Sequence, residues 1–234
     1  MNYGSQGRPL SYRFGQSDAA ANDALWVTYR WMSLGLALTG VVAMGVASSQ
    51  AALQIVVGNP IVFYGLLFAQ LGLVFTFSAV AQRASTAVTA AMFFLYAALT
   101  GATFSVLFLR YTLGSIAGVF FVTAGAFAGL SAIGLFTKRD LSAVGRFAIF
   151  ALIGVFLASI VNIFLHSTGL GFAINVIGVV LFAALTAYDT QKLKMMFASG
   201  EAHANLPLVG ALTLYLDFIN MFLFLLRLGG SRRD

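Results

Sequence analysis

The stretch that decides the fold is Pro207–Leu228, which reads PLVGALTLYLDFINMFLFLLRL. Its only charged residues are Asp217 and Arg227, and its length suits one crossing of a hydrocarbon core about 30 Å thick. Pro207 fits the first turn of a helix, because a backbone N–H there has no helical partner to lose. We therefore predict a transmembrane helix here, with one carboxyl group near its middle.

Six further apolar runs precede this one, and we predict that each forms a membrane-spanning helix: Tyr29–Ala47, Pro60–Gln82, Ser85–Leu109, Thr112–Phe136, Ala143–Leu165 and Gly169–Thr190. Of the 234 residues, 60% are hydrophobic and only 9% are charged, whereas soluble domains carry about 25% charged residues. A soluble fold could not cover so much apolar surface. The predicted class is therefore an all-α integral membrane protein, a bundle of seven transmembrane helices.

The two ends of the chain are polar. Residues 1–25 are rich in Gly, Ser and Asn and have no apolar core, which argues against a cleaved signal peptide and predicts a flexible cytoplasmic tail. Residues 26–230 form the predicted transmembrane domain, and residues 231–234 form a short basic tail. The chain has no cysteine, which excludes disulfides, thiolate metal sites and cysteine nucleophiles.

The basic residues predict the orientation in the membrane. With the N-terminus in the cytoplasm, nine of the thirteen Lys and Arg residues fall on the inner side, as the positive-inside rule favours. Seven spans then place the C-terminus outside, although a seventh segment that crossed only partly would place it inside. This distribution also argues against nucleic-acid binding, which the net charge of +6 would otherwise suggest. A bacterial inner membrane is the expected location, or the endoplasmic reticulum in a eukaryote.

Only two of the seven acidic residues, Asp189 and Asp217, lie in or beside an apolar run. A charge inside a membrane costs several kcal/mol, so both are candidate functional residues. Asp217 shares one helix face with Thr213 and Asn220, and this polar stripe should face the bundle interior. The alternative is that Asp217 only forms a hydrogen bond between packed helices.

Asp189 ends the sixth span, nearer the cytoplasm. The two carboxyl groups can meet only if that helix continues past Thr190, which the amphipathic residues 193–197 permit while Lys192 and Lys194 extend to the surface. The alternative is an ion pair at the helix end between Asp189 and Lys192.

If the carboxyl groups meet, they form a pH switch. Two adjacent carboxylates cannot both stay charged in an apolar setting, so the pair would share one proton and titrate as a unit. Protonated, it can close through a hydrogen bond. Deprotonated, it repels and offers oxygen ligands to a hard cation such as Ca2+, for which Asp189 and Asp217 would be transient ligands. Arg83, at the inner end of the second span, is the cation placed to modulate the pair, or else a positive-inside anchor.

Three motifs resemble the Bax inhibitor-1 family, also called the transmembrane Bax inhibitor motif family. They are YDTQKLK at residues 188–194, LYLDFINMFL at residues 214–223 and GLFTKRDL at residues 134–141. The resemblance extends from about Leu25 to the end of the chain. It implies six helices around a central seventh, and a pH-sensitive Ca2+ leak gated by a pair of aspartates.

The resemblance maps the aspartate pair onto Asp189 and Asp217 and an arginine latch onto Arg83. Some members of the family also carry an acidic residue in the second span, but this chain has none between Asp23 and Asp140. That departure bears on whether a complete cation path is present.

Three functions remain open from the sequence. The first is a pH-sensitive calcium leak channel, with calcium as the transported ion, no cofactor and no enzymatic activity. The second is a non-conducting regulator that binds other membrane proteins, because bacterial relatives include a modulator of a membrane-anchored protease. The third is an intramembrane aspartyl protease, which would use one aspartate as acid and one as base. Asp217 lies in Leu-Tyr-Leu-Asp and not in the Gly-x-Gly-Asp of such proteases, which argues against the third.

Overall fold

Helices make up almost all of the chain that the computed structural model describes, residues 10–199 and 203–233. The eight helices of this part are α1 Leu10–Ala47, α2 Gln50–Val56, α3 Pro60–Ala81, α4 Thr86–Arg110, α5 Leu113–Phe136, α6 Ser142–Leu165, α7 Thr168–Ala198 and α8 Leu206–Gly229. Seven of them, all except α2, are long and apolar enough to cross a membrane. The predicted class, a helical membrane protein with seven spans, is confirmed.

Short polar connections decide where these helices begin. A side-chain oxygen before the first turn accepts a hydrogen bond from that turn's backbone at Ser49, Asn59, Ser85, Thr112 and Ser167. Such caps satisfy N–H groups that have no partner within the helix. The predicted bounds of the second to fifth spans and of the seventh agree with the helices to within one residue.

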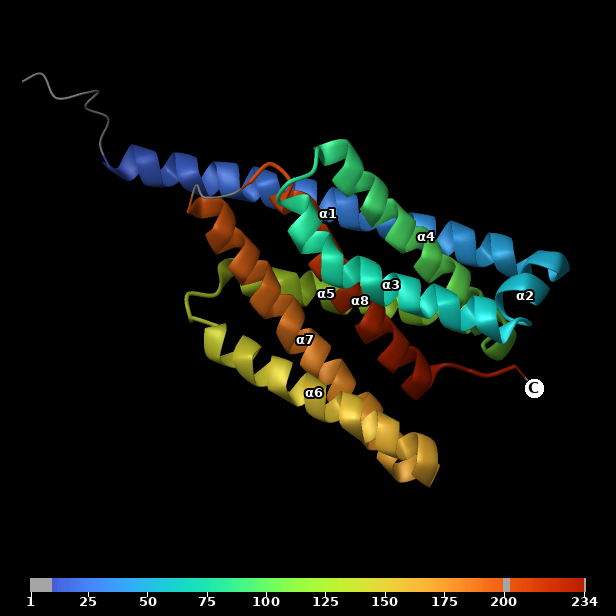
Figure 1. Cartoon of the computed structure of the whole chain (residues 1–234). Helices are drawn as coiled ribbons and strands as arrows, with labels where there is room; N and C mark the ends of the chain where they lie inside the picture. The colour runs from blue at the N-terminus through green and yellow to red at the C-terminus, as the bar shows by residue number, and fades with distance from the viewer. Residues whose placement is uncertain (1–9, 200–202, 234) are drawn as a thin grey trace, which may run out of the picture.

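The last helix, α8, is the centre of the bundle. It packs against α1, α3, α4, α5 and α7, and it runs through the middle of the molecule in Figure 1. Leu214 and Tyr215 on this helix are fully buried, with 0% exposure. Within the described residues α6 packs only on α7, so it joins the bundle from outside. The predicted central position of the seventh span is confirmed, with five of the other six spans packed directly against it.

Two helices extend further than the sequence indicated. The first, α1, begins at Leu10, so residues 10–25 are helical and the prediction of a flexible tail is wrong for them; residues 1–9 lie outside the described residues. Alanines at residues 19–21 favour helix, and Ala21 and Leu25 are buried in the core, which holds this part in place. The second is α7, the helix of the sixth span, which continues past Thr190 to Ala198. This continuation is the condition that was set for the two carboxyl groups to meet.

Glycine lets α5 approach α7 closely beside the candidate site. A Cβ atom on Gly134 of α5 would collide with the backbone carbonyl of Ala187 and lie 3.0 Å from Cβ of Thr190, both on α7. Gly129, one turn earlier on α5, would meet nothing within 4 Å. Only the first of these two glycines is therefore required for helix contact.

Gly134→Leu should destabilise the folded protein strongly, because the added side chain must push α5 away from the backbone of α7. We expect a loss of about 1–3 kcal/mol or more in unfolding free energy, measured as a lower unfolding temperature in detergent. Gly129→Leu is the matched control and should change little. Equal losses in the two variants would contradict the close approach of α5 to α7.

The absence of cysteine permits a direct test of orientation. Lys138→Cys lies at the α5–α6 connection and Ser231→Cys follows α8, and both positions are exposed. A membrane-impermeant maleimide should label the cysteine at 231 in intact spheroplasts and the cysteine at 138 only after permeabilisation. Labelling of both from the same side would contradict a complete crossing by α8.

Candidate functional site: a carboxyl pair between the last two spans

Asp217 lies in the middle of α8 and is buried, with 4% of its surface exposed. Its Oδ2 atom has no hydrogen-bond partner among the described residues. Its predicted neighbours on the helix face, Thr213 and Asn220, are half-buried. They donate hydrogen bonds along α8 itself, to the carbonyl oxygens of Val209 at 3.1 Å and Leu216 at 2.8 Å. The stripe therefore leaves the Asp217 carboxyl group free to interact with another helix.

That other helix is α7, which brings the half-buried Asp189 to Asp217. The two carboxyl groups lie close enough to interact directly with each other. A hydrogen bond between two carboxyl groups requires a proton on one of them. The residues that were predicted to meet from their positions in the sequence are thus brought together by the fold.

The alternative partner of Asp189, Lys192, is directed elsewhere. Its ammonium group lies over the Tyr188 ring, 5.9 Å from the ring centre. Within the described residues it forms no ion pair with Asp189, although it is close enough to act electrostatically on that carboxyl group. Lys192 therefore acts on the Asp189 carboxyl group through its charge, without forming an ion pair with it.

Hydroxyl groups tie the helices together next to Asp189. Thr190 on α7 donates to the Ser131 hydroxyl on α5 at 3.5 Å, and the Tyr29 hydroxyl on α1 lies 3.4 Å from the Thr190 hydroxyl. Thr190 is fully buried. Three helices thus share one weak polar contact directly beside the carboxyl pair.

The C-terminal end of α7 also holds the α5–α6 connection. The Gln191 side chain accepts from the Leu141 N–H and donates to the Arg139 carbonyl oxygen, both at 2.9 Å. The Lys194 ammonium donates to the last turn of α5, at the Leu135 carbonyl oxygen, at 3.0 Å. Two of the quoted motifs, residues 134–141 and 188–194, are therefore hydrogen-bonded to each other in the folded protein.

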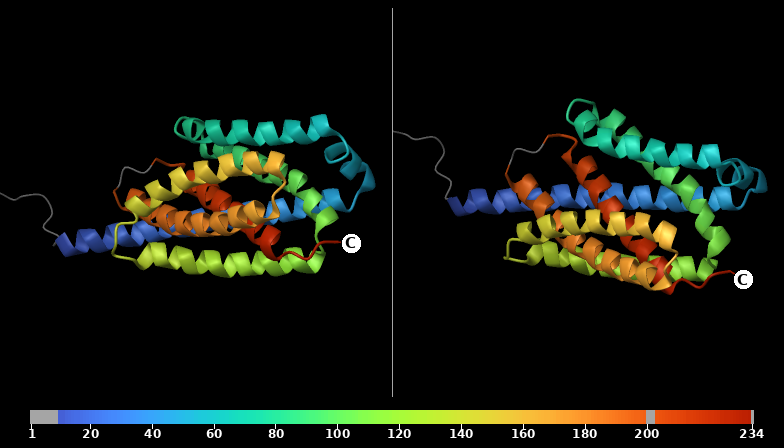
Figure 2. Two further views of the ribbon diagram at one scale, coloured as in Figure 1. Left: turned by 90° about the horizontal axis from the view of Figure 1, so that it is seen from below. Right: turned by 60° about the horizontal axis from the view of Figure 1, so that its bottom comes forward.

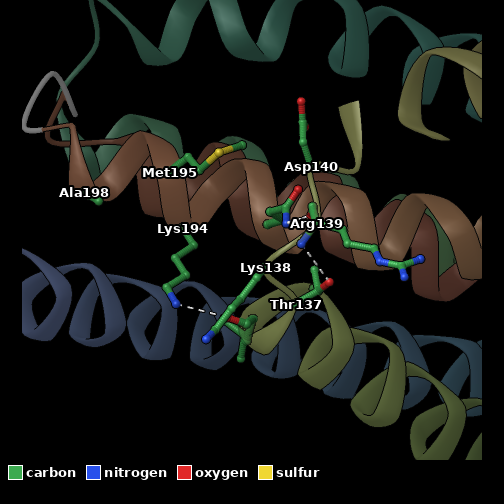
Figure 3. Close-up of a pocket in the computed structure, with 10 residues that line it drawn as sticks. Thr137, Lys138, Arg139, Asp140, Lys194, Met195 and Ala198 are labelled. Carbon is green, nitrogen blue, oxygen red and sulfur yellow. Dashed lines mark hydrogen bonds between the residues drawn. The ribbon is translucent and has the colours of Figure 1, made fainter. Parts of the chain in front are cut away.

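Figure 3 shows the cavity that this connection forms with the end of α7, with a volume of about 370 Å³. The Asp140 carboxylate points away from the ammonium of Lys194 in this view. Asp140 instead accepts hydrogen bonds from Ser142, which lower its pKa. It therefore helps to start α6 and takes no part in the buried pair.

Arg83 lies in the turn between α3 and α4 and is exposed. This turn is fixed by Asn205, whose side-chain amide donates to the carbonyl oxygens of Ala81 and Ala84, both at 2.9 Å. In the described part of the chain, Arg83 contacts neither carboxyl group of the pair. Among the described residues, Arg83 is therefore not part of the site that Asp189 and Asp217 form.

A second polar contact inside the bundle was not found from the sequence. The Tyr215 hydroxyl lies 2.7 Å from the Thr39 hydroxyl, and Thr39 donates to the Ala97 carbonyl oxygen at 2.9 Å. On α4, Thr100 donates to Gln70 of α3 at 3.1 Å. Threonine and tyrosine are common in apolar helices, so only the folded structure shows that these side chains form hydrogen bonds between helices.

The pair alone could supply at most four oxygen atoms to a cation. Calcium takes six to eight oxygen ligands, so backbone carbonyls or water would have to complete its shell. No group of three or more His, Asp or Glu side chains suited to a metal occurs in the described residues. The two carboxyl groups alone would therefore leave the ligand shell of a calcium ion incomplete.

These features define a polytopic helical membrane protein with a carboxyl pair buried between its last two spans. The chain belongs to the Bax inhibitor-1 family: the sequence profile described as "Inhibitor of apoptosis-promoting Bax1" matches residues 21–234. The resemblance noted from the motifs is thereby confirmed.

Individual relatives are bacterial. "Inner membrane protein YbhL" of Escherichia coli is 47% identical over 230 residues, covering 96% of this chain and 98% of the relative. An uncharacterized protein of Deinococcus radiodurans is 48% identical over 208 residues, covering 88% and 89%. An uncharacterized membrane protein of Streptococcus pyogenes is 35% identical over 219 residues, covering 92% and 95%. The predicted location, a bacterial inner membrane with multiple crossings, is confirmed.

Asp217→Asn should change how stability depends on pH. We expect two adjacent carboxyl groups in an apolar setting to hold one proton that the unfolded chain releases, so the unfolding temperature of the wild type should fall as pH rises from about 6 to 8. The amide side chain cannot ionise, so the stability of the variant should vary less with pH. At the upper pH its unfolding free energy should exceed that of the wild type by about 1–3 kcal/mol. Asp140→Asn, an exposed carboxyl group, is the control and should follow the wild type.

Proposed function

We propose that this protein is a pH-sensitive calcium leak channel, gated by the carboxyl pair of Asp189 and Asp217. The observation that carries the proposal is that these two carboxyl groups meet between the last two spans, with Asp217 almost fully buried. Calcium is the transported ion and not a cofactor, and the proposal assigns the chain no enzymatic activity.

Electrostatics supplies the gating step. While the pair holds a proton, a hydrogen bond between the carboxyl groups keeps α7 against α8. When that proton leaves, two negative charges about 4 Å apart repel by about 4 kcal/mol at the effective dielectric constant of a protein. That energy is enough to shift a two-state equilibrium by several hundredfold. The charged pair would then be available to a cation.

The surroundings of the pair support coupling to the cytoplasmic surface. Asp189 lies two residues before Gln191, which holds the α5–α6 connection. A displacement of the end of α7 would therefore move that connection as well. Inside the bundle, Tyr215 lies two positions before Asp217 on α8. The two residues are therefore about 3 Å apart along the helix axis.

Calcium flux into proteoliposomes tests the proposal. We expect uptake by the wild type to increase between about pH 6 and 8, as the shared proton is lost, and Asp217→Asn to remove most of this dependence. Asp140→Asn should behave as the wild type, because that carboxyl group lies outside the bundle. Absence of flux at every pH, from protein shown to be folded and inserted, would overturn the channel proposal.

One observation favours the second candidate, a non-conducting regulator that binds other membrane proteins such as a membrane-anchored protease. The first part of α1 extends past the ends of the neighbouring helices, where a partner could contact it (Figure 2). Removing residues 1–17 would delete this projection and spare Ala21 and Leu25, which are buried in the core.

For this candidate, the truncated protein should fold normally but lose crosslinks to membrane partners that the full chain forms. Retention of every crosslink would argue against it. An aspartyl protease would use the same pair, so cleavage of a transmembrane peptide, abolished by Asp217→Asn, would replace both proposals.

A further inference from the structure

Three arginines from three segments line one cavity at the end of the bundle opposite the N-terminus. Arg110 closes α4, Arg227 lies in the last turn of α8, and Arg232 follows α8. The cavity has a volume of about 360 Å³, and Asn175 of α7 adds an amide to its wall. Nothing in the carboxyl-pair mechanism uses these residues.

The segment after α8 is held in place beside this cavity. Its backbone forms a β-bridge between Arg232 and Tyr111, and Thr112 donates its N–H to the Ser231 carbonyl oxygen at 3.1 Å. The Arg233 guanidinium donates to the Phe108 carbonyl oxygen at 2.9 Å. Figure 2 shows this segment beside the junction of α4 and α5. Arg232 is therefore positioned next to Arg110 by backbone contacts.

No carboxylate balances these arginines within the described residues. The acidic side chains described elsewhere are Asp23 near the start of α1, Asp140 at the opposite end of the bundle, and the buried pair. The Arg227 guanidinium lies over the Phe224 ring, 5.8 Å from its centre. Asp234 lies outside the described residues. Among those that are described, these like charges repel without a carboxylate to balance them, so an anion bound between them would stabilise the arrangement.

The positive-inside rule does not account for this cluster. If the N-terminus is cytoplasmic, as the charge distribution predicts, these arginines lie on the outer side, where the rule disfavours them. Arginine also matches phosphate better than lysine does, because its planar fork donates two parallel hydrogen bonds.

The shape of the cavity indicates which anion it suits. Its lining also includes the apolar side chains Leu107 of α4 and Leu223 of α8, each about one helical turn nearer the bundle centre than the arginine of the same helix. Arginines at the helix ends with apolar side chains one turn deeper fit a headgroup phosphate and the start of an acyl chain. We propose that this cavity binds a phosphate group, and that the phosphate is carried by an anionic phospholipid.

Lipid binding can be measured on the purified full chain by native mass spectrometry, with phosphatidylglycerol and phosphatidylcholine as probes. We expect phosphatidylglycerol to bind and the double variant Arg110→Gln/Arg227→Gln to weaken it at least about tenfold. Arg30→Gln/Arg146→Gln removes two exposed arginines from other parts of the chain and should leave binding unchanged. Arg232→Gln alone tests the site if the double variant fails to fold.

A second arm distinguishes a lipid from a free anion. Inorganic phosphate is added at constant ionic strength, and protection against heat is compared with chloride. Protection by phosphate without binding of phosphatidylglycerol would retain the phosphate site and overturn the lipid assignment. Binding of neither probe, or equal loss in the control variant, would overturn the proposal. Calcium flux does not enter either measurement, so these outcomes are independent of the channel proposal.

Discussion

The meeting of the Asp189 and Asp217 carboxyl groups between α7 and α8 sets the strongest electrostatic constraint on this bundle. A carboxyl group away from water must either hold a proton or find compensation for its charge, because ions are poorly solvated in an apolar bundle. The architecture meets this demand by placing one carboxyl group in the most buried helix and extending α7 to bring the other to it. Close glycine contacts, such as Gly134 against Ala187, keep the surrounding helices near enough to exclude lipid.

The burial of α8 makes it the helix best suited to carry a carboxyl group near its middle. Of the most apolar stretch of α8, 61% of residues are buried inside the protein, compared with 11% for α3 and α6. Phe68 on α3 and Phe150 on α6 are largely exposed, as expected of side chains that face lipid. An aspartate at those positions would meet hydrocarbon, whereas at the centre it meets other helices.

The two ends of the bundle differ in their chemistry. At the end where α7 finishes, Gln191 and Lys194 join the helix that carries Asp189 to the end of α5 and to the α5–α6 connection through hydrogen bonds. At the other end, Arg110, Arg227 and Arg232 gather without a counter-ion among the described residues. The first arrangement suits transmission of movement from the pair, and the second suits recognition of an anion at the membrane surface.

The class of protein, the positions of most spans and the two aspartates that lie in or beside them could be predicted from the sequence. These follow from local physics: an apolar run of sufficient length must cross the membrane, and a charge within it is costly wherever the helix packs. The same reasoning did not find the helical start of α1, because polar composition in residues 10–25 hid alanine-rich helix propensity and the burial of Ala21. Only the tertiary structure decided that Asp189 faces Asp217 and not Lys192, that Arg83 stands apart, and that three distant arginines share one cavity. Each of these depends on the rotation and contact of whole helices, which a linear pattern does not contain.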